Sequence, residues 1–222
     1  VGYPHKGNAT LDPRGIPLLY AGQGVGEKGG VNGPFGFRIF NLINQERLLF
    51  IDGRDKFAYR GWGAFDAAAL VDAETDTLIQ VGENGIIYSV KLNTQYNPDE
   101  GSLSIDPEIV RLRYKSPYDT RIGIENSPIG YRNFIYFVDN TGLLMCIDVN
   151  TLKPVWLRNV TDDTDSTMVL EEINRNEAYL YTACEVDWQG KGGKAYIRKI
   201  NAFTGELIWE YPVDAYYNKD SN

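Results

Sequence analysis

The chain has 222 residues, 43% of them hydrophobic, with 30 acidic against 22 basic side chains and a formal net charge of −8. This length allows one large or two small domains with a sizeable core. The excess of acidic residues argues against nucleic-acid binding, which needs clustered Lys and Arg. The sequence contains no run of 18 apolar residues, so no membrane-spanning helix is predicted.

The chain opens at Val1 without a charged and then apolar signal segment, so we expect a mature protein or an excised piece of a longer one. Its abundance of Tyr, Phe and Gly favours a β-protein with many tight turns. His5 is the sole histidine and has no recognisable Ser or Cys partner. This argues against a Ser-His-Asp arrangement and predicts a surface side chain.

Four segments in chain order follow the same course: an apolar strand, a small-residue or glycine turn, a second strand, and then a polar anchor before a last strand. The segments are 16–49, 76–94, 127–156 and 177–209. The anchors are Asn41, Lys91, Asp148 and Asn201, at spacings of 50, 57 and 53. A further short strand precedes each segment, near 8–12, 66–72, 126–131 and 167–172.

Four strands in each unit of about fifty residues indicate an all-β fold, a β-propeller built of four-stranded antiparallel blades. We expect about four blades in this chain, so that residues 1–222 form a single propeller domain or a segment of a larger ring. An insertion at 95–108 interrupts the second unit. The expected blades span roughly 9–51, 67–114, 124–159 and 168–212.

The two cysteines, Cys146 and Cys184, are 38 residues apart and form no CxxC pair, which argues against metal binding through sulfur. Each lies in an apolar strand-like run, so we predict buried free thiols. A disulfide between them stays open, because the sequence does not show whether they are close.

The last two units resemble the PQQ-like, quinoprotein-type propeller repeat, whose blades carry A-x-D-x-x-T-G-x-x-x-W at the turn between the third and fourth strands. CIDVNTLKPVW at 146–156 replaces the Ala by Cys and the Gly by Leu, and KINAFTGELIW at 199–209 replaces the Asp by Asn. The first two units carry an eroded form. The resemblance identifies these residues as the structural blade motif: Asp148, Thr151, Trp156, Asn201, Thr204, Gly205 and Trp209.

The motif has a mechanical meaning. Thr and Asp side chains can hydrogen-bond the turn backbone, and Gly supplies a positive φ. Trp156 and Trp209 are both expected to be wedged between neighbouring blades, each burying about 200 Å².

Quinoprotein dehydrogenases within this resemblance bind a quinone cofactor with calcium, often beneath a disulfide between adjacent cysteines. Here no two cysteines adjoin, and eight blades would need about twice this length. We therefore expect no cofactor, PQQ included, and carry over no catalytic residue and no metal ligand.

In a propeller, the connectors between blades share one face with those that join the second and third strands. Here these connectors are 22–36, 53–63, 82–85, 115–123, 139–142, 161–166 and 185–193. Arginines beside aromatics on long loops are typical of binding surfaces, although Trp62 and Tyr118 could instead only cover blade edges. The predicted ligand-binding residues are Arg54, Tyr59, Arg60, Trp62, Tyr118, Arg121, Asp163 and Trp188.

Two loops carry other motifs. Gly24, Gly26, Gly29 and Gly30 suggest a phosphate cradle, but no helix follows the flanking strands, so a flexible hairpin loop is preferred. DDTDS at 162–166 offers oxygens at alternate positions, which hard cations prefer, but it lacks the Gly and distal Glu of a calcium loop. A solvated acidic turn is the preferred interpretation, and calcium is left open.

Three functions stay open. The preferred one is a non-enzymatic scaffold or binding module that recognises a protein or other ligand through its loop face. The resemblance implies export to the periplasm, cell surface or medium, because related repeats occur in exported bacterial proteins, including the lipoprotein that assists outer-membrane protein assembly. The alternatives are a fragment of a quinone-dependent dehydrogenase-like enzyme and a carbohydrate-binding cell-surface module, in which Trp62, Tyr118 and Trp188 would stack on sugar rings.

Ring closure also has several solutions. Four blades could close alone, a second copy could complete an eight-blade ring as a homodimer, or further blades could belong to a longer parent.

Overall fold

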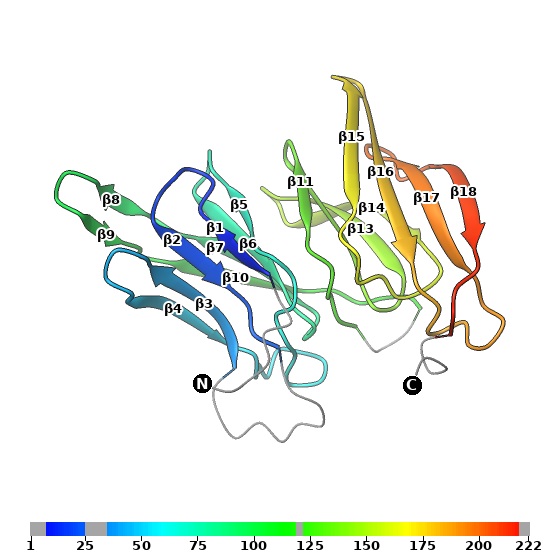
Figure 1. Ribbon diagram of the computed structural model, residues 1–222, viewed down its shortest axis with the longest axis horizontal. Helices are drawn as coiled ribbons and strands as arrows, with labels where there is room; N and C mark the ends of the chain where they lie inside the picture. Colours follow the sequence, from blue (N-terminus) through cyan, green and yellow to red (C-terminus); the bar gives the residue numbers. More distant parts are fainter. Residues whose placement is uncertain (1–7, 25–34, 119–121, 218–222) are drawn as a thin grey trace. The chain divides into compact units, whose positions relative to one another are not determined.

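The computed structural model describes residues 8–24, 35–118 and 122–217, and these residues form 18 β-strands and no helix (Figure 1). His5, Arg121 and the glycines at 26, 29 and 30 lie outside the described residues. In the described part of the chain, no helix is long and apolar enough to cross a membrane. The chain divides into two compact units, residues 1–114 and 115–222.

Unit 1 contains two four-stranded antiparallel sheets and one hairpin. The first sheet has the order β1-β2-β3-β4, from β1 (Ala9–Leu11), β2 (Leu18–Ala21), β3 (Gly36–Asn41) and β4 (Arg47–Asp52). The second has the order β10-β7-β6-β5, from β5 (Leu70–Asp72), β6 (Thr77–Val81), β7 (Ile86–Lys91) and β10 (Glu108–Arg113). Within the expected insertion, β8 (Gln95–Asn97) and β9 (Ser102–Ser104) pair as a separate two-stranded sheet.

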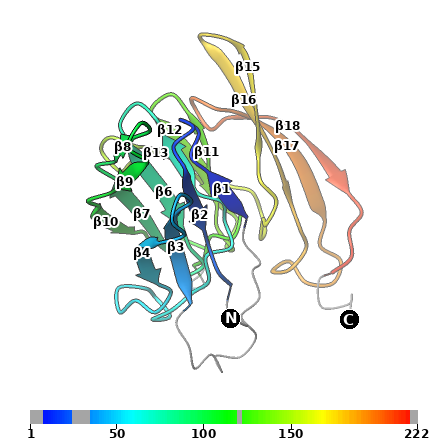
Figure 2. The same cartoon turned by 60° about the vertical axis from the view of Figure 1, so that its left-hand side comes forward.

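Unit 2 contains the third and fourth sheets, in which strand order follows sequence order. The third sheet consists of β11 (Ile129–Tyr131), β12 (Phe134–Val138), β13 (Leu143–Asp148) and β14 (Lys153–Asn159). The fourth consists of β15 (Val169–Asn174), β16 (Glu177–Cys184), β17 (Ala195–Asn201) and β18 (Leu207–Val213). The β15–β16 hairpin extends beyond the upper ends of β17 and β18 (Figure 2).

The core of unit 1 lies between its two sheets, where apolar side chains of alternate strand positions meet. Ile39 from the first sheet and Leu78 from the second are fully buried in it. Phe65 stands between Phe37 and Tyr88, with ring centroids 6.1 and 5.5 Å away. Each such side chain contributes about 1.5–3 kcal/mol by its removal from water.

A polar network at one end of unit 1 joins the same two sheets. Arg14 binds the Asp12 carboxylate at 2.7 Å and also Asp76, which precedes β6. The Tyr20 hydroxyl donates to Asp12 at 2.6 Å. Burial alone would raise the pKa of Asp12, but hydrogen bonds from Arg14 and Tyr20 outweigh burial and lower the pKa.

The core of unit 2 lies between the third and fourth sheets. Tyr136 and Leu144 face Leu180 and Ile200, and all four are fully buried. Alternation is clear in β16, whose every second residue is buried, so that one face of this strand packs on the third sheet. By contrast, β13 is buried from Leu143 to Ile147 and therefore reads as a continuous apolar run.

Both cysteines are free and buried, as the sequence predicts. Cys146 lies in the core of unit 2. Burial raises the pKa of its thiol to about 12. Cys184 lies at the end of β16, with the Arg198 guanidinium 3.5 Å from its sulfur.

The blade-motif turns form the hydrogen bonds expected of them. The Asp148 carboxylate accepts the backbone N–H groups of Asn150 and Thr151 at 3.0 and 2.9 Å. The Asn201 side chain accepts the N–H groups of Phe203 and Thr204 at 2.9 and 3.1 Å. These are Asx turns, which fix the reversal between the third and fourth strands of each sheet.

Trp156 is wedged between two sheets, as expected. Its indole N–H donates to the Ala202 carbonyl of the fourth sheet at 3.1 Å, and its ring lies 5.9 Å from that of Tyr136. Gly205 has φ +72°, and a Cβ added there would lie 2.5 Å from the Trp156 ring. Glycine is therefore required at this turn by both backbone conformation and space.

The same expectation for Trp209 is wrong in the described residues. Trp209 is 43% exposed, and the Tyr181 ring of its own sheet lies 6.1 Å from it. The physical reason is position: Trp156 is covered by the next sheet along the chain, whereas the fourth sheet has no successor among the described strands.

Candidate functional site

The connectors predicted to share one face meet within each unit. In unit 1, the connector 53–63 continues to Ala64, whose carbonyl accepts the Glu83 N–H of the β6–β7 turn at 2.9 Å. In unit 2, the Ser116 and Thr141 hydroxyls lie 2.5 Å apart, and the Trp188 indole N–H donates to the Asn140 carbonyl. Two loop clusters result, one in each unit.

The connector 53–63, called the arginine–aromatic loop below, is held compact by its own backbone. The Asp55 N–H donates to the Gly61 carbonyl at 3.0 Å, and the Gly63 N–H donates to the Gly53 carbonyl at 3.0 Å. Arg54 and Trp62 form an isolated β-bridge across the loop. Its side chains are therefore presented from an ordered backbone, which lowers the entropy lost on binding.

Two arginines of β10 clamp this loop. Arg111 binds the Asp55 carboxylate at 2.8 Å, and Arg113 donates to the Phe57 carbonyl at 3.0 Å. The Phe57 ring lies 5.4 Å from the Arg111 guanidinium and 5.0 Å from that of Arg113, while Arg113 is also 4.7 Å from the Tyr59 ring. Such cation–π contacts contribute about 0.5–1 kcal/mol each at exposed sites.

The Asp55 carboxylate is held ionised. Burial would raise its pKa, but hydrogen bonds from the Phe57 N–H and from Arg111 outweigh burial and lower the pKa. The charge pair with Arg111 is therefore present throughout the neutral range.

An open groove of about 510 Å³ lies beside the loop, between β4 and β10. Its walls combine the apolar side chains of Phe50, Ile51 and Ile109 with Tyr88 of β7. Its polar lining is Asp52, Arg54, Asp55, Lys56 and Arg111, three cations against two carboxylates. We call it the arginine groove.

Of the four residues predicted in this loop, three are on the surface side and one is tied into the fold. Arg54 and Arg60 are exposed. Trp62 is half-buried with Arg60 over its ring at 5.3 Å, and Arg60 also binds Glu83 at 3.1 Å. The Tyr59 hydroxyl donates to the Tyr114 carbonyl, which gives Tyr59 a structural role.

Sequence reasoning missed Asp55, Phe57, Arg111 and Arg113. Asp55 and Phe57 belong to the connector 53–63, which was predicted to lie on the binding face, so the position of that connector was the signal that could have identified them. Arg111 and Arg113 read only as polar positions of a strand, and their partners lie 56 residues away.

The loop cluster of unit 2 is organised by a buried carboxylate. Asp162 is 0% exposed and accepts the backbone N–H groups of Asp187, Trp188 and Gln189 at 3.1, 2.8 and 3.1 Å. Four charge-assisted bonds, counting the Asp163 N–H at 2.9 Å, replace the water that this carboxylate loses. Asp162 therefore fixes the 185–189 loop, a role that the reading of 162–166 as a solvated turn did not foresee.

Three other carboxylates, called the acidic rim, gather beside it. Oxygens of Asp163, Asp165 and Glu185 all lie within 4.8 Å of one another. Burial, followed by the charges of Asp165, Glu125 and Glu185, raises the pKa of Asp163 to about 8. Three carboxylates could hold a hard cation, and without one their repulsion is relieved by a proton on Asp163.

The remaining predicted residues have mixed surroundings. Tyr118 is exposed, as a binding residue would be. Trp188 is half-buried, and its indole N–H donates to the Asn140 carbonyl of the 139–142 connector, so this side chain helps to hold two connectors together. Arg121 lies outside the described residues.

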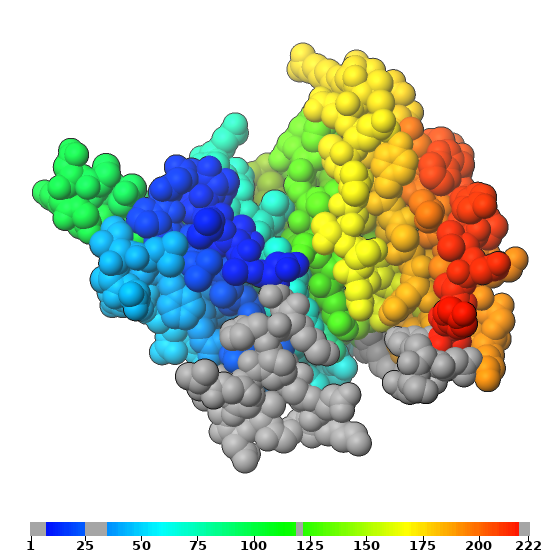
Figure 3. Space-filling view, viewed as in Figure 1, coloured from blue at the N-terminus to red at the C-terminus, as the bar shows by residue number. Residues whose placement is uncertain are grey.

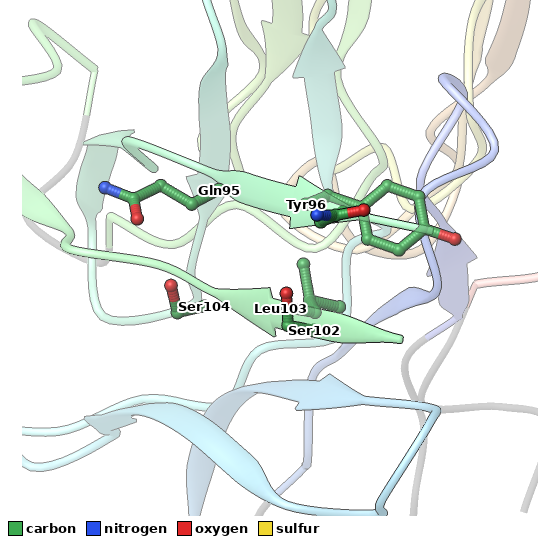
Figure 4. A pocket seen from close by; sticks show the side chains of 6 residues that line it. Gln95, Tyr96, Ser102, Leu103 and Ser104 are labelled. Atoms are coloured by element: carbon green, nitrogen blue, oxygen red, sulfur yellow. The ribbon is translucent and has the colours of Figure 1, made fainter. Parts of the chain in front are cut away.

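A second open pocket, of about 440 Å³, lies on the β8–β9 hairpin (Figure 4). Gln95 and Ser104 pair at one end of the hairpin, and Tyr96 pairs with Leu103 in its middle. Leu103 packs on the core of unit 1, which attaches the hairpin to the sheets. The pocket is mainly polar and lacks charged side chains among its lining residues.

No family model matches the sequence, and no curated protein matches it. Solved structures do resemble the fold. A quinohemoprotein alcohol dehydrogenase from Comamonas testosteroni matches with a TM-score of 0.57 at 10% identity, over 88% of this chain and 33% of that one. Sqt1 from Saccharomyces cerevisiae matches with a TM-score of 0.52 at 14% identity, over 89% of this chain and 46% of that one.

The Dos1 propeller matches with a TM-score of 0.52 at 10% identity, over 88% of this chain and 44% of that one. The chain thus spans less than half of each of these structures. Together with the four four-stranded sheets, these likenesses confirm the predicted fold class, an all-β propeller of four-stranded antiparallel blades.

Proposed function

We propose that this propeller is a non-enzymatic binding module that takes a protein segment into the arginine groove. The observation that carries the proposal is the pairing of an ordered loop with exposed cations. Arg54, Lys56 and Arg60 are exposed on a chain whose net charge is −8, and Arg54 and Lys56 line the groove beside its apolar walls.

The lining indicates the chemistry of the partner. Arg111 is bound to Asp55 and Arg54 lies 3.9 Å from the Asp52 carboxylate, so Lys56 is the lining cation to which we assign an incoming carboxylate. Phe50 and Ile109 offer apolar surface to an aromatic or aliphatic side chain next to that carboxylate. An acidic segment with apolar residues satisfies both, and the arginine–aromatic pairs around it are the residue types that dominate protein interfaces.

The carbohydrate-binding alternative needs aromatic rings free to stack on sugars. The Trp62 ring carries Arg60 on it, and the Trp188 indole is bonded to the Asn140 carbonyl, which favours a protein segment over a glycan. The enzyme alternative would show as quinone absorbance after reconstitution. Export remains a prediction of the sequence resemblance.

Peptide binding tests the proposal. Fluorescein-labelled peptides of alternating Glu and Leu or Phe would be titrated with the protein by anisotropy, beside charge-reversed Lys peptides and a glycan array. We expect saturable binding of the acidic peptides alone, weakened by salt. Lys56→Glu should weaken it at least tenfold, whereas Lys153→Glu, an exposed reversal in unit 2, should not.

Equal effects of the two reversals would show non-specific charge attraction and refute the groove. Saturable glycan binding that is lost with Tyr118→Ala would favour the carbohydrate module instead.

A further inference from the structure

One arginine of the arginine groove already holds a carboxylate, which belongs to the chain itself. Nη1 of Arg111 lies 3.0 and 2.8 Å from the two oxygens of Asp55. In the described part of the chain, Asp55 is the one hydrogen-bond acceptor of Arg111. This charge-assisted pair is the kind of contact by which arginine recognises a carboxylate. Asp55 therefore occupies the position that a carboxylate of a bound acidic segment would take.

The pair is reachable from solvent. Arg111 and Asp55 both line the groove. The Arg111 side chain is 48% exposed, whereas that of Asp55 is 13% exposed. A group that enters the groove can therefore approach Arg111 while Asp55 still holds it. Exposed charge pairs contribute little net free energy, because water competes for both partners, so one carboxylate can replace another at small cost.

The arginine–aromatic loop does not depend on this pair for its shape. The Asp55 N–H donates to the Gly61 carbonyl at 3.0 Å, within the loop's own backbone. On the strand side, Arg113 donates to the Phe57 carbonyl at 3.0 Å and so fastens the loop to β10 by itself. The bond between Asp55 and Arg111 is thus redundant as a fastening.

The Asp55 carboxylate also keeps hydrogen-bond donors if Arg111 turns to another partner. The Phe57 N–H donates to it at 2.9 Å, and the Tyr88 hydroxyl lies 3.5 Å away. The Asn84 amide donates to the Tyr88 oxygen at 2.8 Å, which leaves the Tyr88 proton for Asp55. Release of Arg111 therefore does not leave an unsatisfied carboxylate, which would otherwise oppose the exchange.

We infer that Arg111 is a second carboxylate site of the arginine groove and that Asp55 is its internal competitor. The inference rests on the proposed function of the groove. A bound segment places one carboxylate on Lys56 and exchanges a second one for Asp55 on Arg111. The partner is therefore a segment with at least two acidic residues, and the competition by Asp55 lowers its affinity.

A double-mutant cycle tests the competition. The fluorescein-labelled Glu and Leu peptide would be titrated with the parent, Asp55→Asn, Arg111→Gln and the double variant, and binding would be followed by anisotropy. Asparagine keeps an oxygen for the Phe57 N–H but removes the charge that holds Arg111. We expect Asp55→Asn to tighten binding roughly three- to tenfold, the range of an exposed charge pair. In the Arg111→Gln background the gain should be no more than about twofold, because only screened attraction remains.

Asp99→Asn is the control for the change in net charge. Asp99 is exposed in the turn of the β8–β9 hairpin, whose green atoms project from the rest of unit 1 (Figure 3). It is not among the residues that line the groove. The control removes the same charge as Asp55→Asn and should leave the peptide affinity unchanged.

The outcomes separate this inference from the proposed function. If the parent binds the peptide and Asp55→Asn does not bind it more tightly, or gains equally with Arg111→Gln present, the competition is refuted and the groove stands. Binding by Asp55→Asn alone would support the inference and show that Asp55 closes the groove of the parent. If no variant binds, both proposals fail. Loss of the folded circular dichroism spectrum in Asp55→Asn would also overturn the inference, because the fold would then require the contact.

Discussion

The two equivalent tryptophans should differ in what their truncation costs. We expect Trp156→Ala to lower the free energy of unfolding by about 4–5 kcal/mol and Trp209→Ala by about 2–3 kcal/mol. Both variants lose the stabilisation that comes from burying the tryptophan side chain. Somewhat more than half of its surface of about 200 Å² is removed from water on folding, which contributes about 2–3 kcal/mol.

The difference comes from terms that only Trp156 carries. Its removal opens a cavity between two sheets, at about 1 kcal/mol or more, because Gly205 and Tyr136 cannot collapse into the space. It also leaves the Ala202 carbonyl without its indole donor, at about 1 kcal/mol. Water can fill the space left by Trp209, which is 43% exposed.

Urea unfolding followed by far-ultraviolet circular dichroism measures both variants against the parent. Unchanged slopes would show that the compared transitions expose the same surface. Equal losses in the two variants, or the larger loss for Trp209→Ala, would refute the assignment of the wedge.

Three further changes have definite outcomes. Gly205→Ala should lower the free energy of unfolding in urea by at least about 1 kcal/mol more than Gly15→Ala does. Both glycines have positive φ, but only at Gly205 would the added Cβ lie 2.5 Å from the Trp156 ring. Equal losses in the two variants would contradict this packing. Burial and neighbouring carboxylates raise the pKa of Asp163 from 3.8 to about 8, so the folded state keeps a proton that the unfolded chain releases. The free energy of unfolding should therefore fall as pH rises from about 4 to about 8, and Asp163→Asn should flatten that fall. If the Asp163→Asn variant kept the pH profile of the parent, the raised pKa of Asp163 would be excluded. Asp162→Ala should cost about 3 kcal/mol and speed amide hydrogen exchange at 187–189, whose N–H groups lose their acceptor; protection at the parent level would contradict the anchor.

The sheets could be predicted because their signals are local. Turn anchors such as Asp148 and Asn201 recur at nearly constant spacing, and their hydrogen bonds reach only two or three residues ahead. A repeat of such turns with apolar strands between them fixes the strand order within each sheet. The insertion at 95–108 was visible for the same reason, as a break in the spacing, although its hairpin was not.

The candidate sites depend on contacts between distant residues, which one sequence does not show. The Asp55–Arg111 pair joins a connector to a strand 56 residues later. Asp162 looked like part of a solvated acidic run, yet its carboxylate is buried because three N–H groups of a loop 25 to 27 residues away converge on it. For Trp209, the motif gave the register correctly, but exposure depends on the neighbouring sheet, which a motif does not encode.

Because both thiols are buried, we expect the folded protein not to react with cysteine reagents. Cys146 has a pKa of about 12, so its thiolate, the reactive form, is scarce at neutral pH, and Cys184 is covered at the end of β16. A single cysteine introduced at Lys56 would thus be the one site that a maleimide dye labels in the folded chain. Reaction of the native pair would then begin only when unit 2 opens, and labelling would time the opening of that core.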